Sequence, residues 1–194
     1  MSLDTVTMRE GAQIKSNLAD QTGSVTTKSL RFSPDLSGTE WKALGVPLAS
    51  AVIKNSTEEE ISAPSVQNVD NGIWFARLKD NKTPEFVVDE SAFGMAGLWA
   101  ANGDTYTISS EGAFEFKTLE EPAAPTETGT FLMCSNPNTF TITLKQSAYI
   151  LTTDGTSFEQ EANPEIKPFQ SFVLTDAKTL STLRSLRIGD GVVT

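Results

Sequence analysis

Histidine is absent from this chain of 194 residues, and there is a single cysteine, Cys134. Histidine is the usual general base near neutral pH and the commonest side-chain metal ligand. Its absence excludes a Ser-His-Asp or Cys-His nucleophile and a histidine-bearing zinc site. The G-x-S-x-G, P-loop and G-x-G-x-x-G motifs are also missing. The sequence therefore predicts no catalytic residue, no metal site and no cofactor.

One cysteine leaves no partner for an intrachain disulfide, so packing has to stabilise the fold. Cys134 ends the apolar run 131–134, where it is expected to be a small buried side chain. A nucleophilic cysteine needs an activating cation or base, and the sequence places none beside it.

Basic residues are few: 15 lysines and arginines face 25 acidic residues, which gives a formal net charge of −10. Nucleic acids and anionic membrane surfaces attract basic patches, so neither is expected as a partner. No stretch approaches 18 consecutive apolar residues, so no membrane-spanning segment is predicted. The start of the chain lacks the pattern of a signal peptide, and residues 1–3 look like a leader added by cloning.

What the sequence does contain is Thr, Ser, Val, Ile and Phe in short stretches separated by Asn-Gly, Asp-Gly and Pro. This alternation predicts an all-β, antiparallel two-sheet β-sandwich, jelly-roll or Ig-like, with roughly ten strands. The sandwich is expected over residues 26–194, and residues 1–25 are expected to be a lead-in with at most a short strand. No helix longer than a turn or two is predicted. The clearest strand segments are 26–32, 41–48, 72–78, 85–88, 148–152, 168–174 and 183–188.

Two hairpins are predicted from turn signals. Asn102-Gly103 indicates a type I′ turn, which would place Trp99 opposite Tyr106, and residues 114–117 would add a third strand. Asn136-Pro137-Asn138 would join residues 129–134 to 139–144, where apolar residues alternate with threonines. Residues 72–78 are apolar on both faces and are expected to form a central strand covered on both sides.

Three tryptophans are candidates for stacking on a sugar ring, because an indole offers a flat apolar face. Trp41 and Trp74 lie in dense apolar segments and are expected in the core. Trp99 has small neighbours and is predicted to face Tyr106. The predicted ligand-binding pair is therefore Trp99 and Tyr106.

The acidic residues and Asp-Gly turns carry weaker signals. A glycosidase needs two facing carboxylates, whereas the pairs at 58–59 and 120–121 lie in expected exposed loops. Residues 153–158 resemble a single Asp-box, but a propeller needs repeats, so a hairpin turn at Asp154-Gly155 is predicted. Residues 70–72 and 102–104 lack the spacing of a calcium loop and are interpreted as turns.

Four segments, in order, resemble β-sandwich modules found near the carboxyl end of secreted and surface proteins of Bacteroides-type bacteria: residues 41–48, 125–132, 167–172 and 186–191. The resemblance implies export to the outer cell surface or the extracellular space, where the chain would contact other domains of its parent protein. It implies no catalytic residues.

Together these observations predict a non-catalytic module of an exported bacterial surface protein, which binds a glycan or a host or cell-surface protein, or serves as a spacer. The alternative is a carbohydrate-binding accessory domain, or a catalytic domain, of a glycan-degrading enzyme. Buried Trp99 and Tyr106 rings would argue against sugar binding at that pair, and facing carboxylates in a cleft would favour an enzyme.

Overall fold

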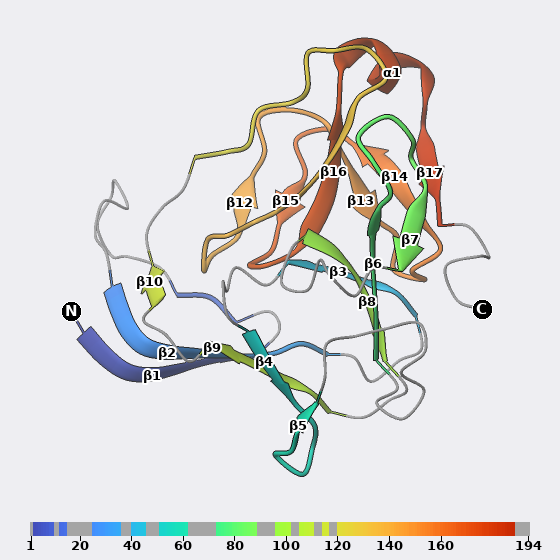
Figure 1. Ribbon diagram of the computed structural model, residues 1–194. Coiled ribbons are helices and arrows are strands. Elements are labelled where there is room, and N and C mark those ends of the chain that lie inside the picture. Colours follow the sequence, from blue (N-terminus) through green and yellow to red (C-terminus); the bar gives the residue numbers. More distant parts are fainter. Residues whose placement is uncertain are drawn as a thin grey trace.

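The computed structural model describes residues 2–9, 12–14, 25–35, 40–45, 51–61, 73–88, 96–101, 105–110, 114–116 and 120–188 (Figure 1). These residues form mainly antiparallel sheets and one short helix, α1 (Ala177–Thr182), which confirms the all-β, sandwich-like fold. Within them, no helix is long and apolar enough to cross a membrane.

The first sheet has six strands and lies across the lower part of Figure 1. Its path runs β1 (Ser2–Arg9), β2 (Val25–Ser33), β9 (Thr107–Ser110), β4 (Ala51–Lys54) and β5 (Glu60–Ile61), and β10 (Phe114–Phe116) also pairs with β2. β1 runs parallel to β2, an exception to the predicted antiparallel pattern. The predicted lead-in thus holds a strand of eight residues, and its Met8 is buried in the core.

The described residues form three further sheets. A four-stranded sheet has the order β3 (Lys42–Gly45), β8 (Ala96–Ala101), β6 (Ile73–Leu78) and β7 (Phe86–Val88). A five-stranded sheet has the order β11 (Phe131–Ser135), β16 (Ser171–Thr175), β13 (Ala148–Leu151), β14 (Ser157–Glu161) and β17 (Ser185–Arg187). β12 (Ile142–Thr143) pairs with β15 (Glu165–Ile166). The fold therefore has more sheets and more strands than the two sheets and roughly ten strands predicted.

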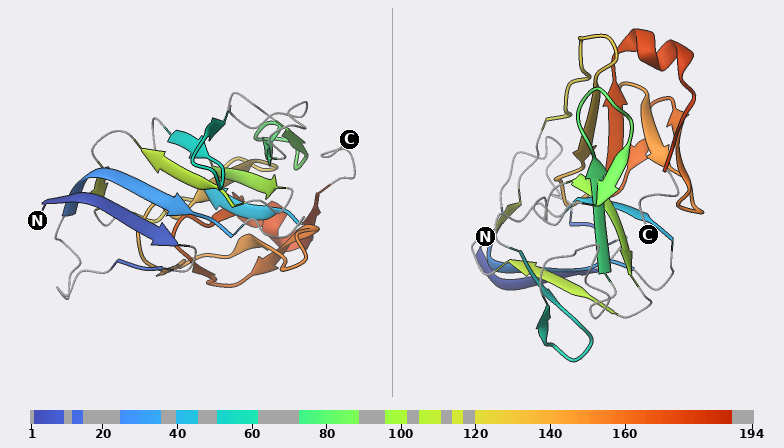
Figure 2. Two further views of the ribbon diagram at one scale, coloured as in Figure 1. Left: turned by 90° about the horizontal axis from the view of Figure 1, so that it is seen from below. Right: turned by 45° about the vertical axis from the view of Figure 1, so that its right-hand side comes forward.

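The four-stranded sheet is the middle layer, because side chains on its two faces belong to two different core clusters. On β6, Phe75 belongs to the cluster shared with the six-stranded sheet, whereas Ala76 and Leu78 belong to the cluster shared with the five-stranded sheet. Successive side chains of a strand point to opposite faces. The prediction of a strand covered on both sides is confirmed for residues 73–78, and the right-hand view in Figure 2 shows β6 between the six-stranded sheet and the five-stranded sheet.

The predicted pairing of Trp99 with Tyr106 is wrong. β8 has β3 on one side and β6 on the other, so Trp99 lies opposite Lys42 and Phe75. β9 pairs instead with β2 and β4, and β10 pairs with β2. β8 pairs with a neighbour along each edge, and the layers above and below cover its faces. These contacts between distant segments outweigh a local turn signal. The turns at 102–104 and 70–72 lie outside the described residues.

The second predicted hairpin is also wrong, whereas the third turn is confirmed. β11 pairs with β16 and β12 with β15, so residues 136–138 do not close a hairpin. The Asp154-Gly155 turn does join β13 to β14. Strands predicted at 26–32, 72–78, 85–88, 148–152, 168–174 and 183–188 match β2, β6, β7, β13, β16 and β17, with β16 and β17 shorter than predicted.

Candidate functional site

A groove of about 320 Å³ lies between β3, the β13–β14 hairpin and the turn that precedes β16. Its volume is at the lower end of the range for small-molecule sites. The groove joins one large aromatic side chain to several hydrogen-bonding groups. Its lining residues are Trp41, Lys42, Ala43, Leu44, Leu151, Thr152, Thr153, Lys167, Pro168 and Gln170.

Trp41 is the aromatic residue of the groove. It directly precedes β3, is half-buried, and packs against the core cluster of the five-stranded sheet while also lining the groove. An indole that the core already holds loses little conformational entropy when a ligand stacks on it. Trp41, which was predicted to be a core residue, is therefore the aromatic ring best placed for a ligand.

The β13–β14 turn forms one wall of the groove. The Asp154 carboxylate accepts hydrogen bonds from the Thr152 hydroxyl (2.6 Å), the Thr156 hydroxyl (2.9 Å) and the Thr156 amide (3.1 Å). The Thr152 bond is the main cause that lowers the pKa of Asp154. Gly155 has a φ of 69°, and a Cβ there would lie 2.8 Å from the backbone N and O of Trp41. The turn thus packs directly against the Trp41 backbone and requires glycine.

The turn at residues 167–170 forms the opposite wall. The Gln170 amide donates to the Lys167 carbonyl (3.1 Å), Pro168 takes the second position, and Phe169 takes the third with a φ of 60°. Positive φ at that position is typical of a type II turn, which normally has glycine there. For a bulky residue this conformation is strained.

Burial and hydrogen bonds hold Phe169 in its strained conformation. Its ring is fully buried and meets Phe32 edge-on, with centroids 5.1 Å apart. Its amide donates to the Asn136 carbonyl (2.9 Å), and its carbonyl accepts from the Gly45 amide (2.6 Å). The core and β3 therefore fix the backbone that carries Lys167 and Gln170.

Asn136 anchors the same turn from the other side. Its side chain is fully buried, and its Nδ2 lies 2.8, 3.0 and 3.1 Å from the carbonyl oxygens of Phe140, Ile166 and Lys167. The backbone amide of Asn136 donates to the Gln170 carbonyl (3.0 Å). Most of these partners are distant in sequence, so a sequence pattern that indicates a turn at Asn136 could not reveal this role.

The polar groups of the groove are cationic or neutral. Lys42 forms an ion pair with Glu40 (Nζ–Oε1, 3.2 Å), and its side chain is 28% exposed. Lys167 is exposed and has no ion pair with any residue in the described ranges. Among the described residues that line the groove, none is an aspartate or a glutamate. The groove can therefore donate hydrogen bonds to hydroxyl or carboxylate oxygens beside an indole surface.

The predicted binding pair lies elsewhere and is not accessible. Trp99 and Tyr106 are 0% and 2% exposed, and both belong to the core cluster next to the six-stranded sheet. Rings buried in this way offer no face to a ligand, so the structure contradicts this prediction. Gly97 is small because a Cβ there would lie 2.3 Å from the Phe75 ring, which packs edge-on against Trp99. Small neighbours therefore indicated close packing rather than an open surface.

The structure gives Cys134 no features of a nucleophile. Its side chain is partly buried and packs with the core cluster that covers the outer face of the five-stranded sheet. Burial raises the pKa of the thiol to about 11. A thiol with this pKa is protonated near neutral pH and reacts slowly.

The acidic pairs at 58–59 and 120–121 lie in turns and loops. Asn55 Oδ1 accepts from the Thr57 and Glu59 amides in the β4–β5 turn, and Glu121 accepts from the Lys145 amide. Three grooves lined by described residues, including the one at Trp41, each have at most one carboxylate among those residues. Across the same part of the chain, no three potential metal ligands gather at one point.

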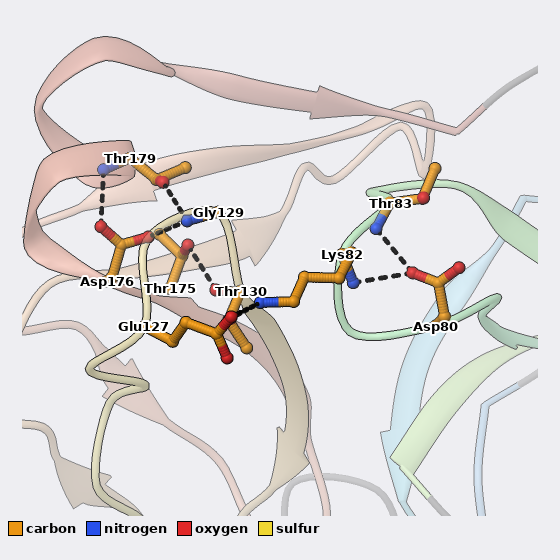
Figure 3. A network of polar contacts seen from close by, with 9 residues as sticks. All are labelled: Asp80, Lys82, Thr83, Glu127, Gly129, Thr130, Thr175, Asp176 and Thr179. Atoms are coloured by element: carbon orange, nitrogen blue, oxygen red, sulfur yellow. Dashed lines mark hydrogen bonds and ion pairs between the residues drawn. The ribbon is translucent and has the colours of Figure 1, made fainter.

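A second polar cluster, shown in Figure 3, joins the β6–β7 loop to α1. Asp176 caps the helix by accepting from the Lys178 and Thr179 amides (3.0 Å each), and it also accepts from the Gly129 amide (2.8 Å). Hydrogen bonding to Thr179 is the main cause that lowers the pKa of Asp176 to about 2. Lys82 reaches across to the Thr130 hydroxyl (2.9 Å). These contacts hold strands and a helix together, so the cluster is explained by structure alone.

Comparison of the chain with family models, with curated proteins and with solved structures found no match. The chemistry of the groove at Trp41 is therefore the feature that points to a function.

Proposed function

We propose that this protein is a non-catalytic module that binds a saccharide in the groove at Trp41. The observation that carries the proposal is the half-buried residue Trp41, which lines a groove together with Lys, Gln and Thr residues. A sugar ring has one face of C–H groups and an edge of hydroxyl groups. An indole beside Lys, Gln and Thr side chains complements both features.

The walls of the groove also suit recognition. Both turns are held by hydrogen bonds or buried contacts within the protein, so the groove needs little ordering when a ligand enters. Preorganisation of this kind reduces the entropic cost of binding. Binding without catalysis fits the absence of histidine from the chain and the absence of a carboxylate from the described residues that line the groove.

The biological setting belongs to the same proposal. The module is part of an exported bacterial surface protein and acts outside the cell, where it binds glycans, including those on host or cell-surface proteins. The support is the resemblance of four segments to such modules. Two of those segments, 41–48 and 167–172, contribute residues to the groove.

A glycan array tests the proposal, with the unmodified protein, Trp41→Ala and Trp74→Ala applied in parallel. Trp74 is also half-buried but does not line the groove, so Trp74→Ala controls for the loss of an indole elsewhere. We expect binding to at least one glycan and a loss of about tenfold or more in Trp41→Ala, because stacking and apolar burial are both removed.

Circular dichroism of the three proteins separates loss of binding from loss of fold. Unchanged binding in a folded Trp41→Ala protein, or an equal loss in Trp74→Ala, would refute the assignment to this groove. An array without any bound glycan would refute saccharide binding and leave the spacer hypothesis.

A further inference from the structure

We infer that the saccharide bound in the groove at Trp41 is acidic, with carboxylates on its sugar rings. This inference rests on the proposed function and narrows its ligand class. It follows from a contrast of charge: the chain carries ten more acidic than basic side chains, yet the described residues that line the groove include two lysines and no acidic residue. The two lysines are thus basic residues in a predominantly acidic chain, and Glu40 offsets part of the charge of Lys42.

Lys167 is the residue that would bind the carboxylate of the saccharide. Its backbone is fixed, because its amide donates to Gln170 Oε1 (2.9 Å) and its carbonyl accepts from the Gln170 amide and from Asn136 Nδ2 (3.1 Å each). Its ammonium group has no acidic partner among the described residues. A fixed backbone, and a charge that no described residue pairs with, leave Lys167 available to an anionic group of the ligand.

Lys42 contributes less, because part of its charge is already matched. Its Nζ lies 3.2 Å from Glu40 Oε1, and the same contact helps to lower the pKa of Glu40. Hydrogen bonding to the Glu40 backbone is the largest cause of that shift. Lys42 is therefore held at the edge of the groove as a donor, while Lys167 provides the unmatched charge.

An acidic ligand uses these groups better than a neutral one. A hydrogen bond between an ammonium and a carboxylate is shorter and stronger than one between an ammonium and a hydroxyl. A neutral sugar would also reduce the hydration of Lys167 without offering an opposite charge. The Trp41 indole would hold either kind of sugar ring, so the charge preference and the stacking can be tested separately.

The test uses hexasaccharides of galacturonan, alginate and hyaluronan, each beside its carboxyl-reduced form. Carboxyl reduction changes the carboxylate to a neutral alcohol and keeps the linkages. Affinities are measured by calorimetry for the unmodified protein, Lys167→Gln, Trp41→Ala and Lys145→Gln. Lys145 is exposed and lies outside the groove, so Lys145→Gln makes the same change in net charge as Lys167→Gln.

We expect at least one uronate hexasaccharide to bind about tenfold more tightly than its reduced form. This preference should weaken at high salt and disappear in Lys167→Gln, but persist in Lys145→Gln. Trp41→Ala should lower the affinity for the acidic and the carboxyl-reduced hexasaccharide by a similar factor.

Equal affinity for the two forms, or binding only to neutral glycans on the array, would overturn the acidic preference and leave the proposed function intact. A preference that persists in Lys167→Gln would overturn its assignment to this groove. Absence of binding to these probes and to the whole array would overturn both proposals.

Discussion

The two turns that form the walls of the groove at Trp41 reach positive φ in different ways. Gly155 has a φ of 69° in a turn closed by its neighbours Thr152, Asp154 and Thr156. Phe169 has a φ of 60° in a turn held by the core and by Asn136. The first turn is stabilised by local chemistry, whereas the second is imposed by residues distant in sequence. The groove therefore combines a wall that forms locally with a wall that exists only in the folded protein.

Substitution of Phe169 should have the largest effect on stability, because burial of its ring compensates for the strained backbone at this residue. We expect Phe169→Ala to lower the free energy of unfolding by about 3–5 kcal/mol, since a fully buried aromatic side chain is lost. Phe169→Gly loses the same ring but removes the penalty of positive φ, and should be about 1 kcal/mol more stable than Phe169→Ala. Urea denaturation of both variants measures the difference. Equal or reversed stabilities would show that the backbone at this position is not strained.

Substitution of Gly155 tests the other wall. A Cβ at Gly155 would meet the Trp41 backbone at 2.8 Å, whereas Gly129 also has positive φ (76°) but nothing within 4 Å of a Cβ. Both alanine variants lose about 1 kcal/mol from the backbone conformation. We expect Gly155→Ala to lose more stability and to weaken saccharide binding. Thermal unfolding and the glycan assay measure these effects, and identical behaviour of the two variants would refute direct packing of the turn on Trp41.

The smallest expected effect is on the stability of the Asp154 turn at acidic pH. The pKa of Asp154 is lowered, mainly by the Thr152 hydroxyl, so the turn gains stability above the ordinary pKa of aspartate and loses it as pH falls through the lowered value. Thr152→Val should raise the pKa of Asp154 toward its ordinary value and reduce this acid-dependent loss. Carboxyl-carbon NMR between about pH 6 and about pH 2 measures the shift. An unchanged pKa of Asp154 in Thr152→Val would contradict the assigned cause.

Features encoded by near neighbours were predictable from the sequence. The Asp154-Gly155 turn follows from its own residues, and the central strand at Ile73–Leu78 follows from apolar residues on both faces. The all-β class follows from the alternation of apolar stretches and turn signals.

Features encoded by distant partners were not predictable. The pairing of β8 with β3 and β6 depends on which strands compete for its two sides, and the small residues around Trp99 gave the wrong signal. The half-buried position of Trp41 depends on Gly155, and the strained turn at Phe169 depends on Phe32 and Asn136. The groove was missed because its walls come from segments far apart in the chain.

The most direct test of saccharide binding at Trp41 is to follow the three tryptophan indole N–H signals by NMR while a glycan selected on the array is added. The chain has only three tryptophans, so single Trp→Phe variants assign each signal. We expect the Trp41 signal to shift with increasing glycan, while the signal of the buried Trp99 stays in place. A shift of the Trp99 signal without a shift of the Trp41 signal would contradict binding in this groove.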